Sequence, residues 1–325
     1  MLNLFTRYKL IIITAVLLLL ITGCNNSSTP STANNSSTAP YLTMTDDTGR
    51  SIVLSHKPER IVVLSPSFLE LLYSLDGHAV GRPNSKLGTI PLAEQEAAEV
   101  GFVYNINLEK VVALQPDLVI GLEGMHDKFV PILESNHIPV MILKYKTYDD
   151  VFDKIALFGT IAGSEQQAHV LAQDLKTKLT AISNKLPAKK VKVAILHATA
   201  KSVTLELDTS IAGSTAKLLQ LENVAADSTP LAVSPELAPY SLEKLVEKNP
   251  DILLVVTMGN STDIEKNMNE TVKNNPAWLS LQAVKNNKVV YLPSDLFLLN
   301  PGLRMPEAVG YMANIVYPEI YANAK

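Results

Sequence analysis

Short apolar runs and amphipathic segments alternate along most of the chain. The runs at 60–64, 117–122, 139–143 and 191–196 are rich in Val, Ile and Leu and have the length of buried strands. The segments between them place apolar residues at helical spacing, as helices on the surface of a globular protein do. Because strands alternate with helices, the pattern predicts an α/β fold whose parallel sheets are covered by helices on both faces.

One stretch of this pattern occurs twice. Residues 107–121 read NLEKVVALQPDLVIG and residues 241–255 read SLEKLVEKNPDILLV, at a constant offset of 134. A capping residue, an amphipathic helix, a Pro-Asp turn and a buried strand produce such a sequence. Two copies so far apart predict two similar Rossmann-like lobes, which we place at 45–146 and 188–325.

The segment between the lobes breaks the alternation. Residues 148–186 show an almost uninterrupted helical pattern, which predicts that one long α-helix over 147–187 joins the lobes as a stiff connector. Gly159 and the pair Gly163-Ser164 are positions at which this helix can kink or divide. The alternative is that the segment is simply the last helix of the first lobe, followed by a separate linker.

Composition narrows the class of protein. The 325 residues are 47% hydrophobic and 18% charged, which is typical of a globular chain and not of a disordered one. The formal net charge is -4 and there is no Lys/Arg block, so we expect no nucleic-acid partner. The single cysteine excludes an intramolecular disulfide and a cysteine-only metal site. We expect a monomer.

The first 24 residues have the pattern of an export signal. Arg7 and Lys9 precede an apolar run over 10–22, which ends at Gly23 and Cys24. The run is shorter than the roughly 20 residues of a membrane span and fits the apolar part of a signal peptide. The sequence ITGC resembles the bacterial lipobox, which implies that Cys24 becomes the lipidated first residue. The alternative is an ordinary signal peptide with an incidental cysteine.

Residues 25–44 follow as a polar segment, mostly of Asn, Ser, Thr, Ala and Pro. Such a composition cannot bury a core and predicts a flexible tether with a reach of roughly 20 Å. Together with Cys24 it predicts an extracytoplasmic protein that is anchored by lipid to the bacterial cell membrane and held a short distance from it.

The motifs of common enzyme classes are missing from the sequence. There is no Walker sequence, no G-x-S-x-G and no H-E-x-x-H. An extracytoplasmic hydrolase is one alternative, but no nucleophile–base pair can be identified for it. A tethered protein with two α/β lobes and no catalytic motif is most simply a solute receptor that is not an enzyme, with its ligand between the lobes at the carboxyl ends of strands.

Several segments resemble one family of such receptors. The sequences RIVVLSPSFLELLYSL, VGRP, YNINLEKVVALQPDLVIG and LNPGLRMPEA are similar to those of substrate-binding proteins of iron-complex and vitamin B12 ABC importers, over about residues 45–320. The resemblance implies two α/β lobes joined by one long helix, a ligand in the cleft, and delivery to a membrane permease with its ATPase subunits.

The same resemblance gives a role to one glutamate in each repeat copy. In relatives, a glutamate at this motif on each lobe contacts arginines of the permease, and the matching residues here are Glu109 and Glu243. The alternative interpretation is that a glutamate in the first turn of a helix stabilises the helix dipole by about 0.3–1 kcal/mol. Both roles are compatible with each other.

The resemblance also points to a ligand. The segments SKLGTIP and EVGFVYNIN are most similar to those of heme receptor lipoproteins, in which a Met of the first lobe and a His of the second bind the heme iron. The matching residues here are Tyr104 and Met258, and both residue types occur as axial heme ligands. The alternatives are a half-buried tyrosine with a hydrogen-bonded hydroxyl and a methionine that only fills apolar space.

Five further residues are candidates for the ligand site. Met125 and His126 lie just after one predicted strand and His197 just after another, at the ends where ligands bind. Either histidine would serve as an axial ligand or as a hydrogen-bond donor, although a lone loop histidine is more often neither. Arg304 and Lys86 would pair with carboxylates such as heme propionates, unless Lys86 is only a solvated surface charge.

Other ligands define the alternatives to heme. A ferric siderophore or cobalamin would keep the receptor role, but siderophore sites need several Arg and aromatic groups and the chain has one tryptophan, Trp278. A bare metal ion bound by His126, His197 and carboxylates is a third alternative. The six histidines are scattered and lack the close spacing of a metal site, which argues against it.

Overall fold

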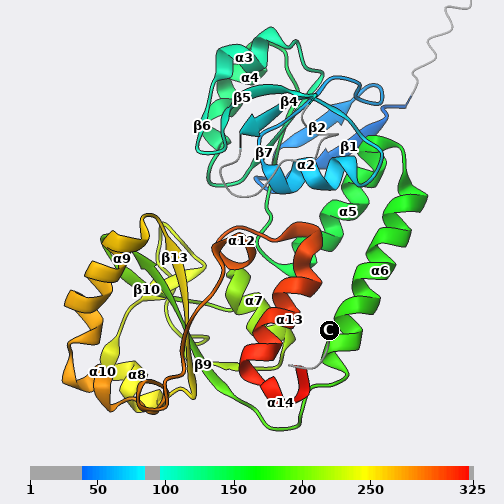
Figure 1. Ribbon diagram of the computed structural model, residues 1–325. Helices are drawn as coiled ribbons and strands as arrows, with labels where there is room; N and C mark the ends of the chain where they lie inside the picture. The colour runs from blue at the N-terminus through cyan, green and yellow to red at the C-terminus, as the bar shows by residue number, and fades with distance from the viewer. Residues whose placement is uncertain (1–38, 85–95, 322–325) are drawn as a thin grey trace, which may run out of the picture. The chain divides into compact units, whose positions relative to one another are not determined.

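The computed structural model describes residues 39–84 and 96–321 (Figure 1). The predicted signal peptide with Cys24, the tether up to residue 38, and Lys86 lie outside these residues. The chain begins with a two-stranded antiparallel ribbon of β1 (Leu42–Thr45) and β2 (Ser51–Leu54). Residues 42–44, which we assigned to the tether, therefore belong to the folded part.

The first lobe is built on a six-stranded sheet. Its strands are β3 (Ile61–Val63), β4 (Ala79–Asn84), β5 (Ala98–Phe102), β6 (Asn105–Ile106), β7 (Leu118–Leu122) and β8 (Val140–Leu143). They lie in the order β6-β5-β4-β3-β7-β8, parallel throughout except for the antiparallel edge strand β6. The strands β5 and β6 were not predicted from the sequence, because neither carries a run of aliphatic residues.

Helices cover both faces of this sheet. They are α2 (Pro66–Tyr73), α3 (Leu108–Ala113), the 3-10 turn η2 (Asp127–Phe129) and α4 (Val130–Ser135). Ile61 and Val63 of β3 point into one hydrophobic core, whereas Val62 and Leu64 point into another. Successive side chains of a strand point to opposite faces, so a run that is apolar throughout is buried on both.

The second lobe repeats this plan with a more mixed sheet. Its strands are β9 (Lys192–Thr199), β10 (Val203–Glu206), β11 (Glu222–Asn223), β12 (Leu237–Pro239), β13 (Ile252–Met258) and β14 (Val289–Tyr291). The order is β12-β10-β9-β13-β14, with β11 also paired to β9. The central pair β9 and β13 is parallel, as are β13–β14 and β9–β11, while β10 is antiparallel to both of its neighbours. The α/β class is confirmed, and each sheet is parallel at its centre and antiparallel at one of its two edges.

The helices of the second lobe are mostly short. They are α7 (Ile211–Leu218), α8 (Leu242–Lys248), α9 (Ser261–Met268), α10 (Pro276–Ser280), α11 (Gln282–Lys285), α12 (Ser294–Phe297), the 3-10 turn η4 (Gly302–Arg304), α13 (Met305–Val316) and α14 (Pro318–Tyr321). The helix α9 is followed directly by the π-helical turn η3 (Asn269–Lys273). In the part of the chain that the structure describes, no helix is both long and apolar enough to cross a membrane.

The two copies of the repeated stretch have the same local structure. The helices α3 and α8 each begin at a capping side chain that accepts a hydrogen bond from the backbone amide three residues on. Asn107 Oδ1 accepts from Lys110 at 3.0 Å, and Ser241 Oγ accepts from Lys244 at 3.2 Å. Such a cap satisfies one of the amides that a helix start leaves without a partner.

The Pro-Asp turns of the two copies also correspond. The residue before each proline, Gln115 or Asn249, has a left-handed backbone with φ of 46° or 45°. The aspartate after each proline then accepts a backbone amide from the start of the neighbouring strand. Asp117 accepts from Arg60 at 2.9 Å and Asp251 accepts from Lys192 at 2.9 Å. Each Pro-Asp pair therefore sets the register of the central strands in its lobe.

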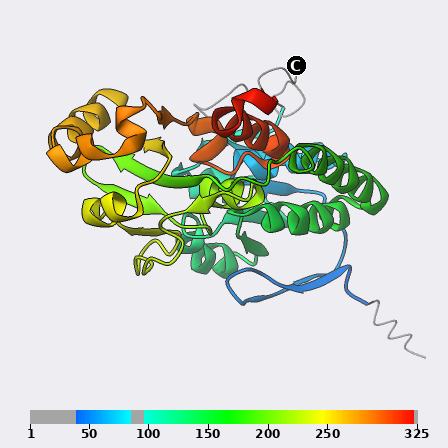
Figure 2. The ribbon, with the colours of Figure 1, turned by 90° about the horizontal axis from the view of Figure 1, so that it is seen from below.

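The predicted single connecting helix is wrong. The segment consists of α5 (Tyr148–Ala162) and α6 (Glu165–Ser183), which Figures 1 and 2 show side by side. Gly163 divides them with φ of 67° and ψ of 38°, a left-handed conformation that ends helices. A Cβ at Gly159 would lie 2.5 Å from the Cβ of Ala168, so this glycine lets the two helices pack closely.

The stiff connection between the lobes is α6 alone. At its first turn the Ser164 hydroxyl donates to the Leu75 carbonyl of the first lobe at 2.6 Å. At its last turn the Ile182 carbonyl accepts from the Tyr321 hydroxyl of the second lobe at 2.6 Å. Its 19 residues span roughly 28 Å at the helical rise of 1.5 Å per residue. The connecting helix is therefore about half as long as predicted, and its role as a stiff connector stays a prediction.

Candidate functional site

Tyr104 lies at the tip of the hairpin formed by β5 and β6. Val103 and Tyr104 are the two turn residues, and Gly101 before them has a φ of 111°. A Cβ at Gly101 would approach the Asn105 carbonyl oxygen to 2.6 Å, so glycine is required for the strands to come this close. The Tyr104 side chain is 61% exposed and stacks on Phe102, with ring centroids 5.6 Å apart and planes at 5°. The alternative of a half-buried tyrosine does not describe this ring.

Met258 lies at the carboxyl end of β13. It is the last residue of the strand and is paired with Thr199 of β9. Its side chain is 53% exposed. A methionine that only fills a core would be buried, so the thioether is available to a ligand at the edge of the sheet where ligands of α/β folds bind.

His197 is held by a carboxylate. It lies within β9, not after it, and its Nδ1 is 2.9 Å from Oε1 of Glu206 on β10. The side chains are 15% and 4% exposed. A carboxylate on one ring nitrogen fixes the tautomer and leaves the other nitrogen, Nε2, to act as a ligand, as in many metal-binding histidines.

The strand register relates His197 to Met258. His197 is paired with Val256 on β13, and Met258 lies two residues further along the same strand. Because side chains alternate between the faces of a sheet, His197 and Met258 lie on the same face. Sequence reasoning missed Glu206 as the partner of His197. The only signal for it was a charged residue in the alternating sequence VTLELD, on the strand next to His197.

His126 is not available to a ligand. The ring is 1% exposed, and both of its nitrogens are bonded to the backbone. The Leu122 amide donates to Nδ1 at 2.8 Å, and Nε2 is 2.7 Å from the Val103 carbonyl oxygen. We therefore remove His126 from the predicted ligands of the iron. Met125 beside it is half-buried, and its role stays a prediction.

Arg304 is paired within its own lobe. Its guanidinium donates to both carboxylate oxygens of Glu307 at 2.8 Å and to Asp295 at 3.0 Å. These hydrogen bonds raise the pKa of Arg304 and lower the pKa of Glu307. A ligand carboxylate would have to replace one of them, so a propionate partner for Arg304 stays a prediction, as does any role of Lys86.

Three side-chain contacts join the lobes beside the connector. The Ser67 hydroxyl donates to the Asn300 carbonyl at 3.1 Å, and the Tyr148 and Thr215 hydroxyls are 2.8 Å apart. The third is the ion pair of Lys146 and Glu236 at 3.2 Å.

Glu109 and Glu243 occupy equivalent positions, each the second residue of its helix. Both are exposed, and neither forms an ion pair within residues 39–84 and 96–321. The lysines that follow them are engaged instead: Lys110 reaches the Glu99 carbonyl at 3.3 Å, and Lys244 pairs with Asp227 at 3.0 Å. The two carboxylates therefore stand out as matched negative charges on the two lobes.

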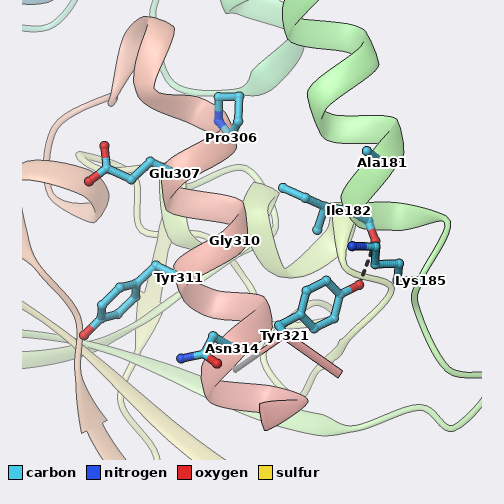
Figure 3. A pocket seen from close by; sticks show the side chains of 9 residues that line it. All are labelled: Ala181, Ile182, Lys185, Pro306, Glu307, Gly310, Tyr311, Asn314 and Tyr321. Atoms are coloured by element: carbon cyan, nitrogen blue, oxygen red, sulfur yellow. Dashed lines mark hydrogen bonds between the residues drawn. The ribbon is translucent and has the colours of Figure 1, made fainter. Parts of the chain in front are cut away.

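Two concave regions of the described surface lie away from these residues. One, of about 500 Å³, is formed by α6 and α13 and includes Ile182, Lys185 and Tyr311 (Figure 3). The other, of similar size, includes Tyr73 and His78. Neither includes any predicted ligand residue, so the candidate site rests on the hairpin and the strand ends. In the described part of the chain, no group of three or more His, Cys, Asp or Glu side chains is placed to hold a metal ion.

This two-lobed architecture is that of a known class of binding protein. Residues 61–296 match the family model described as periplasmic binding protein, which covers well over half of the chain. The chain belongs to the periplasmic binding protein family. The resemblance found in the sequence is thereby confirmed at the level of the family, whose role is to bind a substrate.

Individual relatives bind iron compounds, according to their names. The Fe(3+)-citrate-binding protein YfmC of Bacillus subtilis is 27% identical over 310 residues, covering 92% of this chain and 94% of YfmC. The high-affinity heme uptake system protein IsdE of Staphylococcus aureus is 26% identical over 262 residues, covering 80% of this chain and 88% of IsdE.

Solved structures are similar over most of the chain. An ABC transporter substrate-binding protein from Listeria monocytogenes has a TM-score of 0.72 at 27% identity, covering 81% of this chain and 100% of that chain. S. aureus IsdE complexed with heme has a TM-score of 0.69 at 26% identity, covering 79% of this chain and 98% of that chain. The similarity spans both lobes in each case, because four fifths of this chain cannot be covered by one lobe.

Proposed function

We propose that the protein is the extracytoplasmic binding component of an ABC importer, and that it captures an iron complex, heme foremost, between its lobes. Tyr104 of the first lobe and Met258 of the second are the axial ligands in this proposal. The observation that carries it is that both side chains are more than half exposed, one on a hairpin tip and one at a strand end. An iron that arrives in a porphyrin needs only one or two further ligands from protein.

Two neighbours of these ligands support heme over a smaller iron chelate. The Phe102–Tyr104 stack offers an aromatic face, which suits a large planar ligand. His197, oriented by Glu206 on the face that also holds Met258, supplies a second donor from the same lobe. The heme relative IsdE, similar over most of its length, favours the same ligand class.

A ferric carboxylate complex is the second candidate. It is favoured by the similarity to YfmC, which is named for Fe(3+)-citrate and covers 92% of this chain. A phenolate such as that of Tyr104 is also a suitable ligand for ferric iron. Cobalamin and larger siderophores remain alternatives of the same transport class.

A titration with hemin tests the ligand. The mature chain without its anchor should show a saturable shift of the Soret band, and Tyr104→Ala should weaken binding at least about tenfold. Tyr311→Ala, which removes an exposed tyrosine of α13, is the matched control and should bind as the wild type does. Without a Soret shift in the wild type the heme proposal fails. A rise in melting temperature with ferric citrate would then support the second candidate.

The site of action follows from the N-terminal sequence. In our proposal Cys24 carries the lipid anchor and the tether lets the lobes reach the permease, which is served by ATPase subunits on the other side of the membrane. Cells fed a clickable fatty acid should label the wild-type chain but not Cys24→Ser, which should also move from the membrane fraction to the medium. Label retained by Cys24→Ser would contradict the anchor.

A further inference from the structure

His126 joins two segments that are distant in sequence. Its Nδ1 accepts from the Leu122 amide at the end of β7, and its Nε2 lies 2.7 Å from the Val103 carbonyl in the turn between β5 and β6. The partners determine the tautomer. An amide can only donate, so Nδ1 is unprotonated, and a carbonyl can only accept, so Nε2 carries the proton. The ring is thus a neutral bridge from the sheet to the hairpin.

The surroundings hold the ring in one place. A Cβ at Gly121 would lie 2.9 Å from the Cβ of His126, so the side chain rests directly on the backbone of β7. On its other side the ring stacks with Phe129, with centroids 6.0 Å apart and planes at 21°. A buried ring that is packed on two sides and bonded at both nitrogens has little freedom to move.

We propose that His126 is a positioning residue that holds the hairpin turn and thereby presents Tyr104 to the ligand. Val103 and Tyr104 share a peptide bond, and fixing the Val103 carbonyl fixes the plane of that peptide. The direction in which the Tyr104 side chain leaves the backbone, and its stack on Phe102, follow from this plane. The role of Tyr104 as a ligand rests on the proposed function, whereas the bridge to the turn does not.

The bridge is sensitive to protonation. A second proton on the ring would sit on Nδ1 and face the Leu122 amide, so two donors would meet and the contact would break. Burial lowers the pKa of His126, and Lys128 lowers it further. The hydrogen bond to Val103 and the charge of Asp127 raise it, with a net lowering. From β7 and from the hairpin, the groups bonded to the ring are uncharged backbone. The turn should therefore loosen on acidification, below the ordinary histidine pKa of about 6.5.

A double-mutant cycle tests the proposal with hemin as the probe. His126→Phe removes both hydrogen bonds and keeps a ring against Phe129. It should weaken hemin binding about tenfold in the wild-type background and have no effect on affinity in a Tyr104→Phe background. Equal losses in both backgrounds would show a general structural role and overturn the proposal. His169→Phe changes an exposed histidine of α6 and should leave hemin affinity unchanged in both backgrounds.

A titration of the wild type without ligand gives a second test that needs neither a stable variant nor hemin. In NMR spectra of chain labelled at histidine and tyrosine, His126 should show the Nε2–H tautomer, and the Tyr104 ring signals should shift with the same midpoint as His126. Tyr104 signals that stay constant while His126 becomes protonated would overturn the bridge. If the bridge holds but hemin does not bind, the proposed ligand fails and the positioning of the turn stands.

Discussion

The two copies of the repeated stretch are alike in structure, but the residues at their flanks differ. Both copies have a capped helix with an exposed glutamate, a left-handed residue before proline, and an aspartate that bonds the neighbouring strand. Before the first copy lies an aromatic hairpin with Tyr104, and after the second lies the strand end with Met258. The features that the two copies share suit a role that both lobes have. The flanking residues differ, and they suit a role that is specific to each lobe. We therefore propose that the common part contacts the permease and that the flanks bind the ligand.

The largest effect is expected from reversing the charge of the exposed glutamate in both repeat copies. If the two glutamates contact arginines of the permease, as we propose, the double change Glu109→Lys and Glu243→Lys places like charges opposite each other. It should then lower uptake of the iron complex about a hundredfold, with affinity for the ligand unchanged. Each single change should give a smaller loss, of similar size for the two lobes. Uptake in a strain that lacks the native gene measures this, with Glu247→Lys of α8 as control. Wild-type uptake by the double variant would remove the docking role.

The aspartates of the Pro-Asp turns test whether the copies are equally important for stability. Asp117 accepts two amides, from Glu59 at 2.8 Å and Arg60 at 2.9 Å, whereas Asp251 accepts one, from Lys192. Asp117→Ala should therefore lower the free energy of unfolding by about 2 kcal/mol and Asp251→Ala by about 1 kcal/mol. Urea unfolding followed by circular dichroism measures both. If Asp251→Ala lowers the free energy of unfolding more than Asp117→Ala does, the number of amides each aspartate accepts does not explain the difference in stability.

The flanking residues of the two copies can be compared by the effect of their substitution on hemin binding. Tyr104→Phe removes the phenolate but keeps the ring on Phe102, and should weaken hemin binding about tenfold and change its spectrum. Met258→Leu should cost about threefold, because the iron keeps its ligand from the first lobe. His197→Gln should have the smallest effect, since its ring is only 15% exposed. If His197→Gln shifts the Soret band more than Met258→Leu does, the second-lobe ligand is His197.

A smaller difference between the lobes is expected in their stability at acidic pH. In the first lobe, backbone and side-chain hydrogen bonds hold the pKa of Asp46 below 3.8 against its burial, and burial lowers that of His126. Groups with a lowered folded pKa stabilise above their unfolded pKa, and this stability is lost as the pH falls through the folded pKa. The first lobe should lose protection in hydrogen exchange below about pH 6.5 and again below about pH 4.

The pKa shift of Glu70 has the opposite effect on the stability of the first lobe as the pH falls. Its pKa is raised by burial and lowered by Arg304, with a net rise, so its protonation favours the folded state as the pH falls through the raised value. Glu70→Gln should remove this contribution and steepen the acid loss in the first lobe. Earlier loss of protection in the second lobe than in the first would contradict the assignment of these groups.

Much of the fold follows from patterns within single segments. The strands with aliphatic runs and the capped helices of the repeat were predicted close to their observed bounds. The strand β5 and the edge strand β6 were missed because AEVGF and NI owe their extended conformation to pairing and not to their own residues. The connector was predicted as one helix because its apolar spacing continues past Gly163, and the left-handed backbone at that residue depends on the packing of α5 against α6.

The candidate site, like the fold, was predicted only in part from the sequence. The sequence by itself determined the two lobes, the repeat with its paired glutamates, and the residue types able to bind iron, since these depend on spacing and composition. Only the tertiary structure decided which of those residues are free to act. It buries His126 between Leu122 and Val103, orients His197 through Glu206, pairs Arg304 with Glu307, and leaves Tyr104 and Met258 exposed. The physical reason is that hydrogen-bond partners come from strands and turns distant in sequence, and no local pattern records which of them will meet.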